Sequence, residues 1–214
     1  MKKLLVCLLI VSLLFLQGCT KVKTGEKNYQ YMYDGIFEDW CKHTKPREGQ
    51  TDLLEYGEYR YNSELLLFPR ETPTTLGEFY MRWSMLMDYD AIAIYFTCEL
   101  DQYNYDNFKD GLNNFKIDRY GSGLRYDTEN FDYPTYILKW GWCGGVRHVE
   151  YVMLSEDDLT AIFVFAMYDS SLNDIAKNAK YNVLPHDIDA VKTSNIYPLN
   201  SDFYYDVSFL KYLF

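Results

Sequence analysis

Apolar and polar residues follow two different periods along the middle of the chain. Residues 91–100 (AIAIYFTCEL) alternate, a pattern typical of a half-buried strand. The apolar face of this strand consists of Ile92, Ile94, Phe96, Cys98 and Leu100. The stretch that follows has helical spacing, with apolar residues at Tyr105, Phe108, Leu112 and Phe115. Either Asp101 or Asn104 could cap this helix, and both elements could pack their apolar faces together.

Residues 135–168 predict an antiparallel β-meander. Two alternating segments flank Gly144-Gly145, a strong hairpin signal, and a polar turn at 155–158 precedes the third segment. The third segment, 159–168 (LTAIFVFAMY), is apolar on both faces and should lie in the middle of the sheet. Connections this short permit only antiparallel neighbours, because a parallel crossover needs about a dozen residues or more.

Other segments carry weaker signals. Residues 169–180 predict a short capped helix with Leu172, Ile175 and Ala179 facing inward, and residues 78–87 and 64–68 are strand candidates. The C-terminal residues 203–214 suit a strand or a helix, and their aromatic side chains indicate docking onto the body. The expected fold class is α+β, a mainly antiparallel sheet with a few short packing helices.

The first nineteen residues have a different character. Lys2 and Lys3 precede a 13-residue apolar run at 4–16, which suits an export signal and is too short to span a bilayer. Leu16-Gln17-Gly18-Cys19 follows and resembles the lipobox of bacterial lipoproteins, with Gln17 at the permissive position. The resemblance covers about twenty residues of the 214-residue chain. It implies cleavage after Gly18, a diacylglyceryl group on Cys19, and an outward-facing, membrane-anchored protein.

This resemblance divides the chain into three parts. Residues 1–18 are the cleaved signal peptide, residues 19–33 a lipidated N-terminus with a flexible tether, and residues 34–214 a single globular domain. The tether is expected because residues 20–28 (TKVKTGEKN) are polar, contain a glycine and show no apolar period.

The chain is acidic, with 21 Lys and Arg against 31 Asp and Glu, a formal charge of −10. Cleavage removes two lysines and no acid, so the charge becomes 19 − 31 = −12. A nucleic-acid partner is not expected, because no basic surplus is present to neutralise phosphates.

Motifs for metal or nucleophilic chemistry are scarce. The three histidines, His43, His148 and His186, have no ligand spacing, and the chain has no CxxC pair, so no metal or cofactor is expected. Cys41-x-His43 is a conceivable dyad without an identifiable third partner. The pairs Asp88/Asp90 and Asp187/Asp189 are typical of solvated turns.

Cysteine pairing is open. Cys41, Cys98 and Cys143 could form one disulfide outside the cytoplasm, and a buried reduced Cys98 is equally compatible with its apolar strand face.

One candidate ligand surface lies on the predicted hairpin. Trp140 and Trp142 would share a strand face with Leu138, and Arg147 and His148 lie on the adjoining strand. If exposed, the indoles would form a stacking platform for a sugar ring or a peptide; if buried, they are core, which Leu138 favours.

The sequence therefore predicts an extracytoplasmic lipoprotein that binds a protein or another envelope component without catalysing a reaction. The alternatives are a small-ligand or glycan receptor, and a small hydrolase without a recognisable motif.

Overall fold

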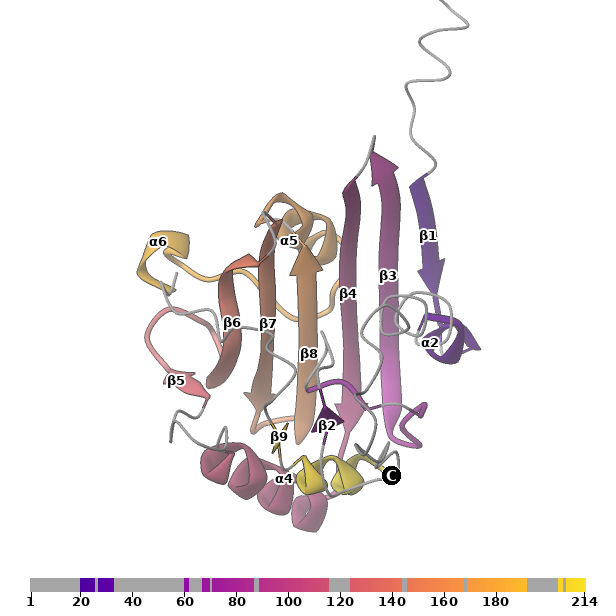
Figure 1. Ribbon diagram of the computed structural model, residues 1–214. Helices are drawn as coiled ribbons and strands as arrows, with labels where there is room; N and C mark the ends of the chain where they lie inside the picture. The colour runs from indigo at the N-terminus through magenta and orange to yellow at the C-terminus, as the bar shows by residue number, and fades with distance from the viewer. Residues whose placement is uncertain are drawn as a thin grey trace, which may run out of the picture.

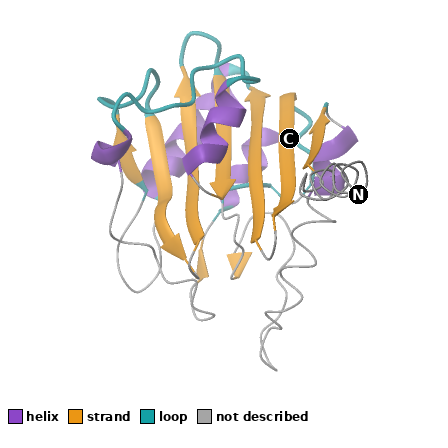
Figure 2. Ribbon diagram, turned by 90° about the horizontal axis from the view of Figure 1, so that it is seen from above, coloured by secondary structure: helices purple, strands orange, loops and turns teal. Residues whose placement is uncertain are grey.

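The computed structural model describes residues 20–25, 27–32, 60–61, 67–69, 71–86, 89–115, 124–143, 146–167, 169–191, 204–205 and 207–214. Its main feature is a seven-stranded antiparallel sheet with helices packed around it (Figure 1, Figure 2). Its strands, in spatial order, are β1 (Thr20–Thr24), β3 (Leu76–Leu86), β4 (Tyr89–Glu99), β8 (Thr160–Met167), β7 (Val146–Ser155), β6 (Thr135–Cys143) and β5 (Arg125–Asp127). The other elements are α2 (Lys27–Met32), α4 (Gln102–Asn114), α5 (Asp169–Ala176), α6 (Ile188–Val191), the short pair β2 (Arg60–Tyr61) and β9 (Tyr204–Tyr205), and the 3-10 helix η2 (Ser208–Leu213). The described residues thus have the expected α+β class.

The meander predicted at 135–168 is confirmed. Strands β6, β7 and β8 are consecutive antiparallel neighbours, with Thr135 opposite Met153 and Ser155 opposite Thr160. The last strand, β8, is buried along its whole length and is fourth of the seven strands. An apolar run without alternation therefore marked the centre of the sheet correctly.

Strand β4 and helix α4 also follow the sequence prediction. Four predicted apolar residues of β4, and Leu100 directly after it, belong to the same buried cluster as Phe108 and Leu112 of α4. Asp101 is the N-cap, because its carboxylate accepts a hydrogen bond from the backbone N–H of Asn104 at 2.7 Å. The strand is not half-buried as its alternation suggested, since Ala93 and Tyr95 are buried on the opposite face.

Two hydrophobic clusters cover the two faces of the sheet. We call the first the α4 face: α4, η2, Tyr29 of α2 and residues 67–68 cover it. Figure 1 shows α4 and η2 side by side across one end of the strands. We call the second the α5 face, which α5, the segment 177–191 and Phe131 cover. The sheet is thus the middle layer of three.

A β-bulge in β6 changes which residues share a face. The register shifts between Ile137 and Lys139, so Leu138 is an extra residue opposite β7. Leu138 consequently packs on the α4 face, whereas Trp140 packs on the α5 face. The prediction that Trp140 and Leu138 share a face is wrong for this reason.

The region after Cys19 differs from the expected tether. Thr20–Thr24 pairs with β3 as an edge strand, and Tyr29 of the following helix is fully buried with its hydroxyl donating to the Pro69 carbonyl at 2.6 Å. Among the described residues, Thr20–Thr24 and Tyr29 therefore already belong to the fold, although they precede Asp34. The sequence did not indicate this, because an edge strand with lysines at Lys21 and Lys23 resembles a polar linker.

The weaker sequence predictions can each be compared with an observed element. The strand expected at 78–87 is β3, and the helix expected at 169–180 is α5 with Leu172 and Ile175 buried. The ambiguous C-terminus holds both β9 and η2, and Phe209, Leu210 and Leu213 dock as expected. Leu67 and Phe68 are buried but not in a strand, and residues 64–66 lie outside the described residues.

Candidate functional site

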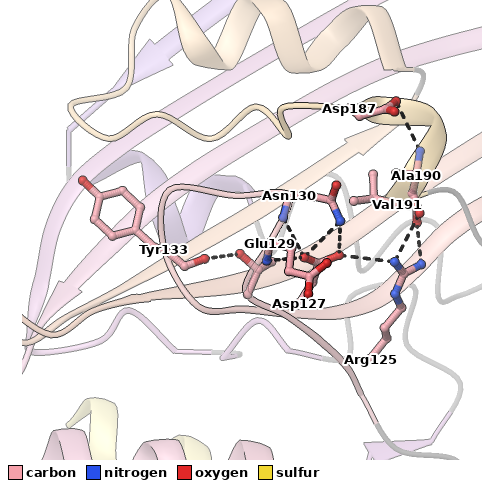
Figure 3. A network of polar contacts seen from close by, with 9 residues as sticks. Arg125, Asp127, Glu129, Asn130, Tyr133, Asp187, Ala190 and Val191 are labelled. Atoms are coloured by element: carbon pink, nitrogen blue, oxygen red, sulfur yellow. Dashed lines mark hydrogen bonds and ion pairs between the residues drawn. The ribbon is translucent and has the colours of Figure 1, made fainter.

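The densest polar network that the structure describes surrounds Asp127, at the end of β5 (Figure 3). Its carboxylate is almost fully buried and accepts hydrogen bonds from the backbone N–H groups of Glu129 and Asn130 at 3.0 and 2.9 Å. The Asn130 amide and the Arg125 guanidinium donate to it as well. Burial alone would raise the pKa of Asp127, but the hydrogen bonds from Asn130 and Glu129 and the charge of Arg125 hold it below its usual value.

Arg125 extends this network to α6. Its guanidinium donates to the carbonyls of Ala190 and Val191, both at 3.2 Å, and so satisfies acceptors at the C-terminal end of that short helix. At the other end, the Asp187 carboxylate accepts from the backbone N–H groups of Asp189 and Ala190. Asp187 is therefore a capping residue, as expected for a solvated turn. The network closes the loop after β5 and attaches α6 to it.

A second polar group, Asp132 with Asn182 and His186, lies at the surface of the same region. The Asp132 carboxylate is 2.7 Å from Nε2 of His186 and accepts from the Asn182 amide at 2.9 Å. The hydrogen bond to Asp132 raises the pKa of His186, and a hydrogen bond to the Glu129 backbone adds to this. The same contact lowers the pKa of Asp132. The contact thus favours the charged form of each of the two groups.

This arrangement is poorly suited to general-base catalysis. A base must be deprotonated and must reach the proton of a nucleophile, as in a serine–histidine pair. Here the carboxylate favours the protonated imidazole, and within the described part of the chain the ring contacts no hydroxyl or thiol. The backbone N–H of His186 also donates to the Asn130 carbonyl at 2.7 Å. The group therefore joins the segment 177–191 to the loop 128–134.

A third group fastens the beginning of the same segment. Tyr181 donates its hydroxyl to Asp158 at 2.8 Å, and Lys180 donates through its amine to Tyr181 and through its backbone N–H to Glu78. The carboxylate of Glu78 also accepts from Tyr95 at 2.8 Å. Burial, followed by the contact with Glu78, raises the pKa of Tyr95, so this phenol stays protonated as a donor.

The residues proposed from the sequence do not form the expected platform. Trp140 is fully buried and stacks against Tyr151, with ring centroids 5.8 Å apart and planes 8° from parallel. The burial of Trp140 in the cluster of the α5 face contradicts the prediction that it contacts a ligand. The backbone places Trp142 opposite Arg147 and Gly141 opposite His148, but the side chains of these residues lie outside the described part of the structure.

Of the three cysteines whose pairing was left open, the structure describes the side chain of Cys98. Cys98 is free and fully buried, and burial raises the pKa of its thiol to about 12, which makes it unreactive. The side chains of Cys19, Cys41 and Cys143, the Cys41/His43 dyad and the Asp88/Asp90 pair lie outside the described residues. No cluster of three or more potential metal ligands occurs among the residues that were placed.

The Asp127 and Asp132 groups were not identified from the sequence. The run 127–133 (DTENFDY) is typical of a loop closed by Asx turns, but His186, the partner of Asp132, lies 54 residues further along the chain.

Comparison with known proteins finds no matching family model, no similar curated protein and no similar solved structure. In the described segments, no helix has the length and apolar character required to cross a bilayer.

Proposed function

We propose that the protein is a bacterial lipoprotein, anchored through a diacylglyceryl group on Cys19, whose folded domain binds an envelope component outside the cytoplasm. The support for anchoring is the coincidence of Lys2 and Lys3, the apolar run 4–16 and the box Leu16-Gln17-Gly18-Cys19. The position of β1 is compatible with it, since cleavage after Gly18 would leave every described element intact.

A binding role is favoured over catalysis because the described polar groups hold segments of the chain together. The three described groups, around Asp127, Asp132 and Tyr181, each attach a loop or the segment 177–191 to the sheet. A hydrolase would need two titratable side chains around a shared substrate position. The buried Trp140 weakens the glycan-receptor alternative, because that alternative depended on an exposed indole pair.

Mass spectrometry of the protein purified from its membrane fraction tests the anchoring. The expected N-terminal residue is Cys19 with a diacylglyceryl group. The variant Cys19→Ser should lose the group and be processed poorly. A mature chain that retains an unmodified Met1 to Gly18 would refute the proposal.

Crosslinking on intact cells tests the binding role. A recurrent envelope protein should be trapped by the native chain but not by an unrelated lipoprotein that serves as the control. A thermal-shift panel of glycans, peptides and divalent ions tests the receptor alternative, because selective binding to the native state raises the unfolding midpoint. A clear shift with one glycan and no recurrent crosslinked protein would favour that alternative.

A further inference from the structure

The backbone register shows which end of the sheet adjoins Cys19. One continuous row of paired residues crosses six strands: Val22, Arg82, Ala93, Ala166, Val149 and Trp140. Thr20 lies two residues beyond this row, opposite Ser84. The sheet end beyond the row, which we call the Thr20 end, therefore includes the start of β1 and the β3–β4 and β6–β7 hairpins (Figure 1).

Both hairpins reach further than Thr20 itself. In the first hairpin the last pair is Leu86 with Tyr89, two residues or roughly 7 Å past the Ser84 position. In the second the last pair is Cys143 with Val146, three residues past Trp140. Besides Asp90, Arg147 and His148, which are charged or titratable, these strand ends hold six apolar or aromatic residues: Trp83, Met85, Leu86, Tyr89, Trp142 and Val146. Three of the six, Trp83, Tyr89 and Trp142, are of the two types that are enriched where proteins meet the headgroup region of a membrane.

The opposite end of the sheet has a different composition. It holds the turn between β7 and β8 and the beginning of α4, next to the pair Glu99 and Thr160. Among the described residues, exposed acidic side chains outnumber the cations there, of which Lys109 pairs with Glu156 and Lys180 lies near Asp158. The acidic residues are Glu99, Asp101, Asp106, Glu156, Asp157 and Asp158. An anionic membrane repels such a surface over about one Debye length, about 10 Å at moderate salt.

We propose that the Thr20 end lies against the lipid bilayer, with both hairpins in the headgroup region and the acidic end directed away from it. This inference rests on the proposed lipid anchor. Since a single peptide unit spans about 3.8 Å, β1 begins directly beside an acylated Cys19 and leaves the domain little freedom to turn over. The occupant of this surface is the membrane that holds the anchor, and the acidic end remains free to meet a partner.

Photolabelling of the lipidated full-length mature chain tests this orientation. The chain is reconstituted in vesicles of phosphatidylethanolamine and phosphatidylglycerol that contain a phospholipid with a diazirine in its headgroup. After irradiation, peptide mass spectrometry should find several-fold more lipid adducts in residues 83–91 and 141–148 than in residues 99–110 and 155–160. Equal labelling of both ends, or more labelling at the acidic end, would overturn the orientation.

The mass of the Cys19 peptide, read in the same sample, separates the two proposals. A lipidated Cys19 with even labelling would remove only the orientation, whereas an unmodified Cys19 would remove the anchor as well. A second variant carries a long glycine–serine spacer between Cys19 and Thr20. The spacer should reduce the difference between the two ends several-fold, since it lets the domain rotate. An unchanged difference would contradict the role given to the short connection.

Discussion

The two faces of the sheet are covered by different means. On the α4 face, aromatic rings from the sheet, α4, η2 and the irregular residue Phe68 pack against one another, and two buried hydrogen bonds hold residues 67–69. Phe163 stacks on Phe96 with centroids 4.3 Å apart, and Phe108 lies 5.8 Å from Phe163 and 5.5 Å from Phe209. On the α5 face, the short helix α5 is joined by the segment 177–191, in which only α6 is helical. Polar side chains attach that segment at three places.

The difference separates two sources of stability. Apolar contact is not directional and grows with the area removed from water, so the α4 face should account for much of the unfolding free energy. Hydrogen bonds and exposed ion pairs contribute little each, but they fix position. We expect substitutions on the α4 face to lower global stability, and substitutions of the polar links to loosen the segment 177–191 first.

The largest expected effect is that of Phe163→Ala. The side chain is fully buried between Phe96, Phe68 and Phe108, so its removal leaves a cavity and should lower the unfolding free energy by about 3–5 kcal/mol. Urea denaturation of the chain without its lipid anchor measures the loss. The control is Tyr103→Ala on α4, whose side chain is 70% exposed and should change stability by only about 0.5 kcal/mol. Similar losses for both variants would contradict the account of the α4 face.

Asp127→Ala should have the next largest effect. The change removes a carboxylate that accepts hydrogen bonds from Glu129, Asn130 and Arg125, and we expect a loss of about 1.5–3 kcal/mol. Hydrogen exchange should accelerate in residues 125–133 and 188–191 before it accelerates in β8. The control Asp157→Ala changes an exposed carboxylate and should leave both regions unaffected. Equal acceleration of hydrogen exchange in all strands would show that the polar links of the α5 face do not loosen independently of the rest of the sheet.

Gly111→Ala tests how closely α4 approaches η2. In a helix interior this change normally stabilises by up to about 1 kcal/mol. A Cβ at this position would overlap the Cβ of Phe209, so we expect a loss of roughly 1–3 kcal/mol instead. The neighbouring variant Asp110→Ala adds no atom to the interface and should be close to neutral. A stabilised Gly111→Ala, measured by the same urea titration, would mean that the two helices are not in contact.

Sequence reasoning predicted the parts of the fold in which one apolar period covers the whole element. Helix α4 and the central strand β8 are examples, because their burial repeats at 3.6 residues or runs without interruption. Sequence reasoning failed where a single extra residue determines the face of a side chain, or where a partner distant in the sequence determines the secondary structure. The extra residue Leu138 reversed the face of Trp140, and β1 is a strand only because β3 supplies its hydrogen-bond partners.

The polar links of the α5 face were beyond prediction for a related reason. The local signal, an Asx-type loop after Asp127, was present in the sequence. The loop also makes contacts with residues far away in the sequence, such as that between Arg125 and Val191, which are 66 positions apart. Without a periodic pattern, nothing in residues 177–191 indicated which side chains would meet the loop.

The smallest expected effect belongs to His186, and its sign depends on pH. The folded state raises the pKa of this histidine above the ordinary value of 6.5, so folding is favoured by proton binding. The contribution is fully present below pH 6.5 and is lost as the pH rises through the higher pKa of the folded state. Asp132, with its lowered pKa, loses its part only as the pH falls through its own folded-state pKa, below 3.8. The pair is therefore strongest in mildly acidic solution.

His186→Gln should remove this dependence without affecting the α4 face. Urea titrations at about pH 6 and about pH 8 should show a native chain that loses a little stability on going to the higher pH, and a variant that loses less. Asp132→Asn should flatten the profile in the same way, and the double variant should flatten it no further than either single one, because all three remove the same ion pair. Additive effects would mean that the two side chains act separately. Relative to the intrinsic exchange rate at each pH, the protection of residues 182–188 should fall at the higher pH in the native chain only, which separates a local link from global stability.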